Sequence, residues 1–197
     1  MPYCRSIISN FKQGDIILIG GSSRSGKTTF ANNLRLALQE KGYTAWTLSL
    51  DRWLKDVGSR SPGVLGRYDL SIIHGLISRH ATGLKRPERL NLPEYCKLQQ
   101  RTFFTGESIL IQPEDILIIE GVIALILARG VEHIQRYFIE IDESVRKYRV
   151  LEEYIARGRD YHEAEAIYLA RQLDEYPVIN QLSVGAIHIN IMDLCSR

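Results

Sequence analysis

The feature that most constrains the fold is a glycine-rich segment that follows a short apolar run near the N-terminus. Residues 15–19 read Asp-Ile-Ile-Leu-Ile and end at two glycines, and a pattern typical of a helix then runs from Lys27 to Lys41. A short apolar run bounded by glycines is typical of a buried parallel strand. Residues 44–50 favour a second strand. The order strand, glycine loop, helix, strand predicts a right-handed parallel crossover.

The loop itself matches a phosphate-binding pattern. Residues 21–28, Gly-Ser-Ser-Arg-Ser-Gly-Lys-Thr, fit G-x-x-x-x-G-K-[ST] at every fixed position. Glycines let backbone N–H groups face phosphate oxygens, and the following helix adds its positive end. Lys27 would place its charge between the β- and γ-phosphates, and the Thr28 hydroxyl would hold Mg²⁺. Because a strand precedes the loop and a helix follows it, a nucleoside triphosphate site is favoured over a structural glycine turn. Its predicted binding residues are Gly21, Ser22, Ser23, Arg24, Ser25, Gly26, Lys27, Thr28 and Thr29.

Two carboxylates follow predicted strands. Asp51 comes directly after the second strand, and Glu120 ends a third apolar run at residues 116–119. Ligands of a doubly wound sheet bind beyond the carboxyl ends of its strands, so both acids are expected at the same edge as the loop. A phosphotransferase needs a carboxylate to orient or deprotonate the attacking hydroxyl, and oxygen ligands for Mg²⁺. The alternative is structural, with Asp51 as a cap and Glu120 in an ion pair.

The rest of the chain alternates between strand and helix patterns. Residues 52–67 have the composition of a loop, residues 68–80 favour a helix, and residues 83–113 are expected to be irregular because they contain three prolines. A fourth strand is predicted at 137–141, helices at 144–157 and 162–175, and a last strand at 186–191. This alternation predicts an α/β three-layer domain with a mostly parallel sheet over residues 1–197.

Composition narrows the function classes. The chain of 197 residues carries 25 basic and 23 acidic residues, a net charge of +2, which argues against a nucleic-acid coat or a polybasic membrane binder. The longest apolar stretch, residues 116–128, is interrupted by Glu120 and is too short to span a bilayer. The N-terminus lacks the apolar core of a signal peptide. The three cysteines, Cys4, Cys96 and Cys195, have no metal-site spacing. A cytoplasmic protein with idle thiols is expected.

Five segments together resemble a known family. They are residues 20–34 (GGSSRSGKTTFANNL), 48–53 (LSLDRW), 67–69 (RYD), 115–125 (DILIIEGVIAL) and 156–160 (ARGRD). In this order they resemble the uridine kinase/phosphoribulokinase group of P-loop kinases, which includes nicotinamide riboside kinases. The sequence around Tyr68 and Asp69 is similar to the nicotinamide riboside kinases. Residues 91–101 are closer to the acceptor segment of uridine kinases.

The resemblance implies a P-loop NTPase fold with a helical lid at about 144–160 and an acceptor-binding insertion at about 52–113. It also implies ATP and Mg²⁺ as cofactors. Asp51 would be the catalytic base, and Thr28, Asp51 and Glu120 would surround the Mg²⁺. The residues implied on the acceptor side are Asp51, Trp53, Tyr68, Asp69 on the ribose hydroxyls, Tyr95 and Arg101. Trp53 and Tyr68 could equally belong to the core.

The chain departs from the uridine kinase pattern at two places in the acceptor segment. Cys96 stands where uridine kinases typically have an aspartate. Gln99 and Gln100 precede Arg101 where the family carries a histidine. Both differences concern recognition of the base, so the resemblance does not imply uridine itself as the acceptor.

Arginines gather in the predicted lid. Arg146, Arg149, Arg157 and Arg159 lie in or just beyond the helix expected at 144–157. Arginines that close over a nucleotide stabilise charge on the γ-phosphoryl oxygens, and this interpretation is favoured for Arg157, as a catalytic residue, and for Arg159, as a nucleotide-binding residue. The alternative is a solvated helix face, on which Glu152 and Glu153 neutralise Arg149.

These patterns favour an ATP-dependent kinase that transfers a phosphoryl group to a primary hydroxyl, most simply the 5′-hydroxyl of a nucleoside of the uridine, cytidine or nicotinamide riboside type. The expected partner is this small acceptor, with neither nucleic acid nor a membrane involved. Two alternatives stay open. The acceptor could be another hydroxyl compound such as an antibiotic, or the chain could be a regulatory module that binds a nucleotide without transfer. Asp51 and Glu120 favour an enzyme, because a binding module needs no base.

Overall fold

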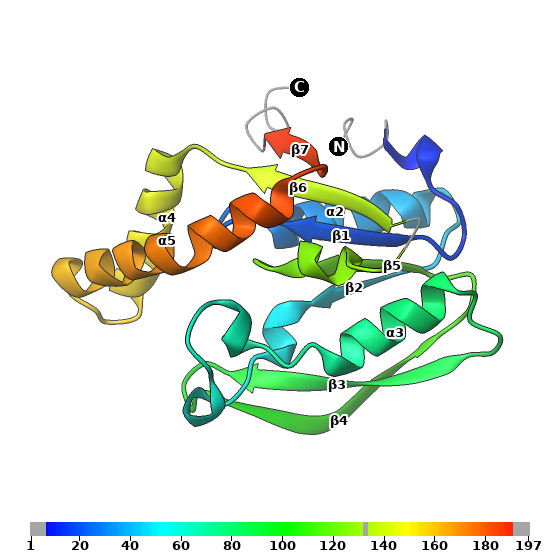
Figure 1. Cartoon of the computed structure of the whole chain (residues 1–197), viewed down its shortest axis with the longest axis horizontal. Coiled ribbons are helices and arrows are strands. Elements are labelled where there is room, and N and C mark those ends of the chain that lie inside the picture. The colour runs from blue at the N-terminus through cyan, green and yellow to red at the C-terminus, as the bar shows by residue number, and fades with distance from the viewer. Residues whose placement is uncertain (1–6, 132–133, 191–197) are drawn as a thin grey trace.

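The structure is a computed structural model that describes residues 7–131 and 134–190. Its centre is a sheet of five strands in the order β2-β5-β1-β6-β7, and every neighbouring pair is parallel (Figure 1). The strands are β1 (Ile16–Gly20), β2 (Ala45–Ser49), β5 (Ile116–Glu120), β6 (Ile134–Glu140) and β7 (Ile187–Asn190). The predicted α/β fold with a mostly parallel sheet is confirmed.

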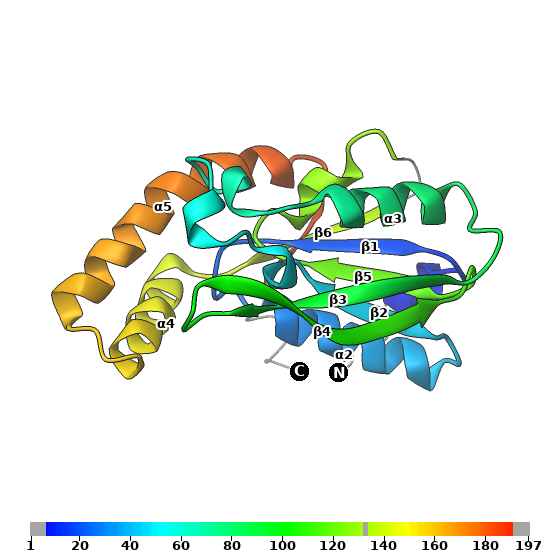
Figure 2. The ribbon, with the colours of Figure 1, turned by 90° about the horizontal axis from the view of Figure 1, so that it is seen from below.

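The two faces of the sheet carry separate hydrophobic cores because strand side chains alternate between faces. Ile17 and Ile19 pack with Phe30 and Leu34 of α2 (Lys27–Glu40), beside the short turn η1 (Ile8–Asn10). Leu18 belongs to the other core, which includes residues of α3 (Ser71–Ala81) and η5 (Ala124–Ala128). The two helices therefore cover opposite faces of the sheet (Figure 2), which gives three layers.

Residues 88–111 form a β-hairpin, so the prediction of an irregular segment at 83–113 is wrong. β3 (Glu88–Cys96) pairs antiparallel with β4 (Arg101–Ile111) as a separate two-stranded sheet. The prolines fall where strands tolerate them: two flank the hairpin, and Pro93 lies at a register shift in β3. Prolines beside a strand or at a register shift do not prevent the two strands from pairing.

Three short turns and α3 connect β2 to this hairpin. The turns are η2 (Leu50–Trp53), η3 (Val57–Ser59) and η4 (Leu65–Arg67), as the loop-like composition of residues 52–67 predicts. α3 begins at Ser71 rather than at Tyr68. The reason is Asp69, whose side chain accepts hydrogen bonds from the backbone N–H and the hydroxyl of Ser71 and so forms an Asx turn ahead of the helix.

A pair of helices projects from one end of the sheet (Figure 1). α4 (Glu143–Ala156) begins at Asp142, and α5 (Tyr161–Ser183) begins at a capping box formed by Asp160 and Glu163. α5 is longer than the predicted 162–175, because it continues past Pro177. Val150, Leu151, Ala164 and Tyr168 form the core that holds the two helices together.

The expectations about the cysteines and about membrane spans can be compared only with the described residues. Cys96 is a free thiol, whereas Cys4, Cys195, the first six residues and the end of the last predicted strand lie outside the described residues. Across residues 7–131 and 134–190, no helix combines the length and apolar character needed to cross a bilayer.

Candidate active site

The phosphate loop joins β1 to α2 at the carboxyl edge of the sheet, and its backbone requires glycine at both fixed positions. Gly21 has a φ of 141°, and a Cβ there would lie 2.6 Å from the carbonyl oxygen of Ile139. Gly26, the residue before α2, has a φ of 97°. Both values are in the region that favours glycine. The backbone conformation of the loop therefore requires the two glycines that the motif fixes.

The side chains of the loop leave polar groups for a ligand. The hydroxyl oxygens of Ser23 and Ser25 are buried and have no hydrogen-bond partner among the described residues. Lys27 is 7% exposed, and its Nζ donates to the carbonyl oxygen of Ser22 at 2.7 Å. Buried hydroxyls without partners and an inward ammonium group fit the phosphates of a nucleotide.

Lys27 lies among three carboxylates. Burial lowers the pKa of Lys27, while the charges of Glu120, Asp51 and Glu175, in decreasing order of effect, oppose that change. Asp51 and Glu120 are thus close to the loop, as the strand-end argument predicts. Glu175 was not predicted from the sequence.

Thr28 and Glu120 meet across the sheet edge. The Thr28 hydroxyl donates to Oε1 of Glu120 at 3.1 Å, and Glu120 is 3% exposed. The parallel register places Ile19 opposite Glu120, so the end of β5 lies beside the start of the loop. A hydroxyl and a carboxylate are oxygen ligands that suit Mg²⁺. No group of three or more acidic, histidine or cysteine side chains is gathered for a metal ion in the described part of the chain, and Mg²⁺ ordinarily takes one or two protein carboxylates, with phosphates and water as the rest.

Asp51 lies on the exposed side of the same edge. It is the second residue of η2, directly after β2, and its side chain is exposed. Burial raises the pKa of Tyr68, and the charges of Asp51 and Glu175 raise it further. Asp51 is therefore near both Lys27 and Tyr68, between the phosphate loop and the segment expected to bind an acceptor.

Three of the residues expected on the acceptor side, Trp53, Tyr68 and Asp69, lie in or just after the turns η2 and η4. Trp53 and Tyr68 are buried and belong to the core. A short antiparallel pairing joins their segments, since the backbone N–H of Asp69 donates to the carbonyl oxygen of Trp53 at 2.9 Å. The hydrogen bonds from Ser71 lower the pKa of Asp69, so Asp69 is a carboxylate held at the start of α3.

Tyr95 and Arg101 lie near the end of the β3–β4 hairpin. The hydroxyl of Tyr95 accepts a hydrogen bond from Arg60 at 2.6 Å, and the Arg60 guanidinium lies 5.3 Å from the centre of the Tyr95 ring. Arg101 is exposed and lies 3.8 Å from the carboxylate of Asp56. Both hairpin residues are thus tied to the turns that follow β2.

The predicted lid contacts the phosphate loop through Glu153 of α4. Glu153 forms ion pairs with Arg24 of the loop and with Arg157, and Arg149 donates to the carbonyl oxygen of Arg24 at 3.3 Å. Burial tends to raise the pKa of Glu153, but Arg24, Arg157 and Lys97 outweigh it and hold the pKa below its usual value. Two of the predicted nucleotide-site arginines therefore share one carboxylate.

The other two arginines of the segment have different surroundings. Arg146 is 3% exposed, pairs with Glu143 and lies over the ring of Tyr168 at 4.9 Å, so it packs between α4 and α5. Arg159 is exposed and pairs with Glu163 at 3.1 Å. Arg149, Arg157 and Arg24 are the arginines that meet at the loop.

Sequence reasoning missed Arg67 and Glu175. Arg67 pairs with both Asp174 and Glu175 of α5, and Glu175 is 4% exposed. The buried positions of α5 include Tyr168, Glu175 and Ile179, which are spaced by seven and four residues and share a face. That spacing was the available signal, because it puts an acid on an apolar face.

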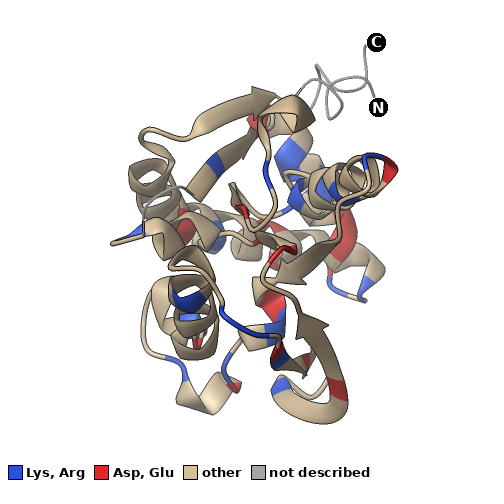
Figure 3. Cartoon of the chain, turned by 90° about the vertical axis from the view of Figure 1, so that its right-hand side faces the viewer, with Lys and Arg blue, Asp and Glu red and all other residues tan. Residues whose placement is uncertain are grey.

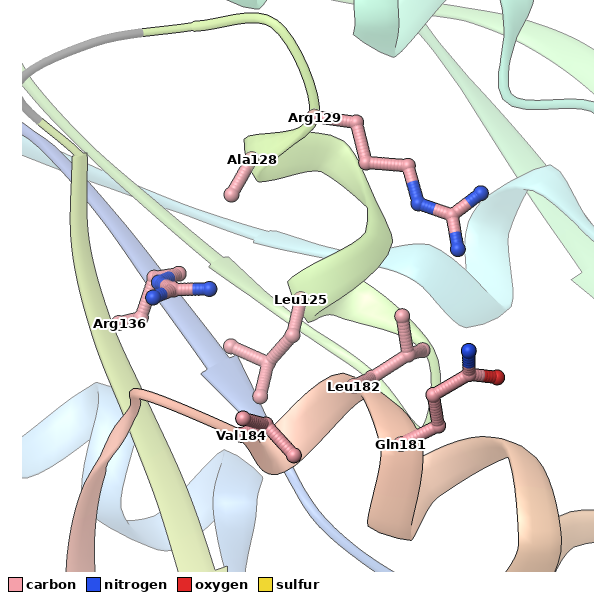
Figure 4. A pocket seen from close by; sticks show the side chains of 7 residues that line it. All are labelled: Leu125, Ala128, Arg129, Arg136, Gln181, Leu182 and Val184. Atoms are coloured by element: carbon pink, nitrogen blue, oxygen red, sulfur yellow. The ribbon is translucent and has the colours of Figure 1, made fainter.

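A shallow pocket elsewhere has none of these features. It measures about 210 Å³ and lies between η5, β6 and the end of α5. Figure 4 shows Arg129 and Arg136 on opposite sides of Leu125, so their charges do not converge. None of the predicted site residues lines it.

Fold and site together define the class. A parallel sheet with β1 at its centre, a phosphate loop that opens α2 and a carboxylate at the end of the neighbouring β5 are the parts of a P-loop kinase. The sequence matches the family model of the phosphoribulokinase/uridine kinase family over residues 16–192. The chain belongs to this family, which makes it a kinase and implies use of ATP and Mg²⁺.

Solved structures agree with this fold. The chain is similar to a candidate fructose transport system kinase from Silicibacter sp. TM1040, with 18% identity, a TM-score of 0.69 and 94% of each chain covered. It is also similar to a possible uridine kinase from Bacillus stearothermophilus, with 19% identity, a TM-score of 0.59 and 95% of each chain covered. A D-glycerate 3-kinase from Cryptococcus neoformans is similar with 13% identity and a TM-score of 0.58, and the match covers 90% of this chain and 85% of that chain. No protein with a curated description matches the sequence.

Proposed function

We propose that this kinase transfers the γ-phosphoryl group of ATP to a primary hydroxyl of a small molecule, and that the acceptor is a nucleoside that reacts at its 5′-hydroxyl. The observation that carries the proposal is the meeting of Thr28 and Glu120 beside a buried Lys27, with Asp51 nearby. A site that only binds a nucleotide would need the loop and Lys27, but it would not need an exposed carboxylate such as Asp51 near them.

The donor side of the site would bind MgATP through the phosphate loop, two metal-binding side chains and the arginines of the lid. Backbone N–H groups of residues 21–28 bind the phosphates, and Lys27 exchanges its contact with the Ser22 carbonyl for phosphate oxygens. Thr28 and Glu120 would hold Mg²⁺, which adds positive charge where the transferred group is most negative. Asp51 could complete that site through water. Arg24 and Arg157 would leave Glu153 for the γ-phosphate as α4 closes, and Arg159 would bind the nucleotide from the end of the lid.

The transfer itself needs one proton acceptor. The acceptor hydroxyl oxygen forms a bond to the γ-phosphorus, the bond from that phosphorus to the β,γ-bridging oxygen breaks, and ADP leaves with the electron pair. Asp51 orients the hydroxyl and takes its proton. Because phosphoryl transfer has a loose transition state, orientation accounts for a large part of this contribution.

The proposal that the acceptor is a nucleoside depends on the residues of the acceptor side. We infer that residues 52–113 form the acceptor-binding insertion and residues 144–160 the lid. Asp69 would accept hydrogen bonds from ribose hydroxyls, while Tyr95 and Arg101 would line the base pocket, with Tyr68 and Trp53 buried behind them. The similarity to a possible uridine kinase supports this choice, and Cys96, in place of the aspartate of uridine kinases, argues for a different base preference.

A screen tests the proposal. Thermal unfolding is measured with MgATP and one compound at a time: uridine, cytidine, nicotinamide riboside, ribose or kanamycin. Ligands that bind only the folded chain raise its stability, and ADP release is measured for each compound that does so. We expect turnover with a ribonucleoside. Turnover with kanamycin alone would replace the nucleoside with an antibiotic hydroxyl, and binding of ATP without any transfer would replace the kinase with a regulatory module.

A further inference from the structure

The Glu175 carboxylate is buried beside the site with one of its oxygens unused. Glu175 is 4% exposed, and its Oε1 accepts a hydrogen bond from Arg67 at a long 3.3 Å. Its Oε2 is buried and has no partner among the residues that the structure describes. Burying half of a carboxylate without a hydrogen bond is unfavourable. A ligand group that donates to Oε2 would remove this cost.

The position of Glu175 points to the acceptor rather than to ATP. α5 passes beside the turns that lead into α3 (Figure 2), and Arg67 joins the two segments. Tyr68, the next residue along the chain, and Lys27 both respond to the charge of Glu175 in their pKa values, and both also respond to Asp51. Glu175 and Asp51 therefore both lie near Lys27 and Tyr68.

Glu175 shares its positively charged partner with another carboxylate. Arg67 is the guanidinium that pairs with Glu175, and it also pairs with Asp174, so one positive charge serves two carboxylates. Asp51 adds a negative charge near Tyr68, whereas Lys27 and Arg171 add positive charges. An acceptor that brings its own phosphate or carboxylate against Oε2 has no proton to donate there and meets the charge of Glu175 at short range, in partly desolvated surroundings.

We propose that Glu175 is an acceptor-binding residue whose Oε2 receives a hydrogen bond from a hydroxyl or amino group of an uncharged or cationic acceptor, and that it excludes anionic acceptors. The inference rests on the proposed kinase function and narrows its substrate class. It separates this chain from kinases whose acceptor is an acid, such as the D-glycerate 3-kinase of the same fold.

The first experiment is Glu175→Gln in the full chain, with Asp174→Asn as the matched control. Both substitutions remove one carboxylate from Arg67, but Asp174 is partly exposed, and the charges that act most strongly on the pKa values of Lys27 and Tyr68 include Glu175 and not Asp174. With uridine, cytidine or nicotinamide riboside, whichever is turned over, Glu175→Gln is expected to raise the acceptor KM by roughly 10-fold or more. The KM for ATP should change less than about threefold, and Asp174→Asn should change neither KM by more than that.

Thermal unfolding shows whether each variant is folded. Should Glu175→Gln fail to fold, Glu175→Asp keeps the charge and withdraws the oxygens by one methylene, and the same rise in acceptor KM is expected. An unchanged acceptor KM in the folded variant would overturn the inference. So would an equal rise in Asp174→Asn, because the effect would then belong to the ion pairs of Arg67.

The second experiment separates this inference from the proposed function. Binding and turnover are measured with MgATP for the three nucleosides and kanamycin, and for the anions D-glycerate and ribulose 5-phosphate. Turnover of kanamycin that Glu175→Gln weakens would keep the inference and contradict the nucleoside. Binding of uridine without transfer, lost in Glu175→Gln, would keep the inference and contradict the kinase. Preference for either anion, or no binding of any uncharged or cationic compound, would overturn the inference.

Discussion

At the scale of single residues, Asp69 holds the start of α3, and the proposed function gives the same carboxylate a second task. Its Oδ1 accepts hydrogen bonds from the backbone N–H of Ser71 at 3.1 Å and from the Ser71 hydroxyl at 2.7 Å. These bonds form an Asx turn that fixes the side chain just before α3. In the proposed function the same carboxylate also binds ribose hydroxyls. A carboxylate has about four lone-pair positions, so the turn leaves room for a ligand.

The substitution Asp69→Asn separates these tasks, because an amide oxygen still accepts the bonds from Ser71 whereas the negative charge is lost. We expect the KM for a ribonucleoside to rise by roughly 10-fold or more, since charge-assisted hydrogen bonds are the stronger kind, while the KM for ATP stays within about twofold. The control is Ser71→Ala, which removes the hydroxyl bond to Asp69 and should lower the melting temperature without raising the acceptor KM. Steady-state kinetics with uridine and 2′-deoxyuridine complete the test. Equal use of the two nucleosides by the wild type would remove Asp69 from the acceptor site.

At the scale of elements, α4 is connected to the phosphate loop through the ion pair of Glu153 with Arg24. Glu153 pairs with Arg24, which has an unusual φ of 65° for a residue other than glycine. The same carboxylate holds Arg157 one helical turn later. The arrangement keeps two guanidinium groups near the loop without leaving them to repel each other. It also predicts a pH-dependent contribution to stability.

The prediction concerns Glu153→Gln. The pKa of Glu153 is lower in the folded chain than its ordinary value of 4.5, so its ion pairs stabilise the fold fully above that value and are lost as the pH falls through the folded pKa. We expect the variant to be less stable than the wild type by about 1 kcal/mol at pH 7, the order for a partly exposed pair. Urea unfolding at pH 7 and at about pH 3 measures this difference, which should largely vanish at the lower pH.

Glu152→Gln is the matched control for that experiment, since Glu152 bonds to Tyr148 rather than to Arg24. It should show a smaller loss at pH 7. A difference between wild type and Glu153→Gln that stays constant across the pH range would show that the charge of Glu153 does not hold α4 to the loop.

Elements with local signals could be predicted from the sequence. β1, the loop and the start of α2 follow from an apolar run, two glycines and a helical period, and the strand-end argument brings Asp51 and Glu120 to one edge. The β3–β4 hairpin could not be predicted in this way, because its stability comes from pairing between residues such as Leu90 and Ile109. The number of prolines does not distinguish a loop from this hairpin, because what matters is their position at its ends and at the register shift. Glu175 was missed since its role depends on which helix face is buried.

At the scale of the whole molecule, the site is assembled from segments far apart in the chain. Residues near 27, 51, 67, 120, 153 and 175 meet at one edge of the sheet. Figure 3 shows acidic and basic residues interspersed along the ribbon, and the net charge is +2. Charge at the site therefore comes from local pairs rather than from an overall field. A ligand that bridges these segments should stabilise the entire fold.

That expectation gives a prediction for MgATP. A ligand at 100 times its Kd stabilises a folded protein by about 2.7 kcal/mol, and for a chain of this length this corresponds to a rise of roughly 5–10 °C in the melting temperature. Removing Mg²⁺ with EDTA should abolish most of the rise, because Thr28 and Glu120 act through the metal ion. Differential scanning fluorimetry measures both effects, with Lys27→Ala as a variant that should show little rise. An equal rise with and without Mg²⁺ would contradict the role given to Thr28 and Glu120.

The most direct test of the central claim, that this edge of the sheet transfers a phosphoryl group, is the turnover of Asp51→Asn with saturating ATP and acceptor. The substitution keeps the shape of the side chain and removes its charge and basicity. We predict that kcat falls by roughly 100-fold or more, as is usual when a general base is lost, while the Kd for MgATP measured by calorimetry stays within about threefold. A kcat close to that of the wild type would contradict the account, because Asp51 would then neither orient the acceptor hydroxyl nor take its proton.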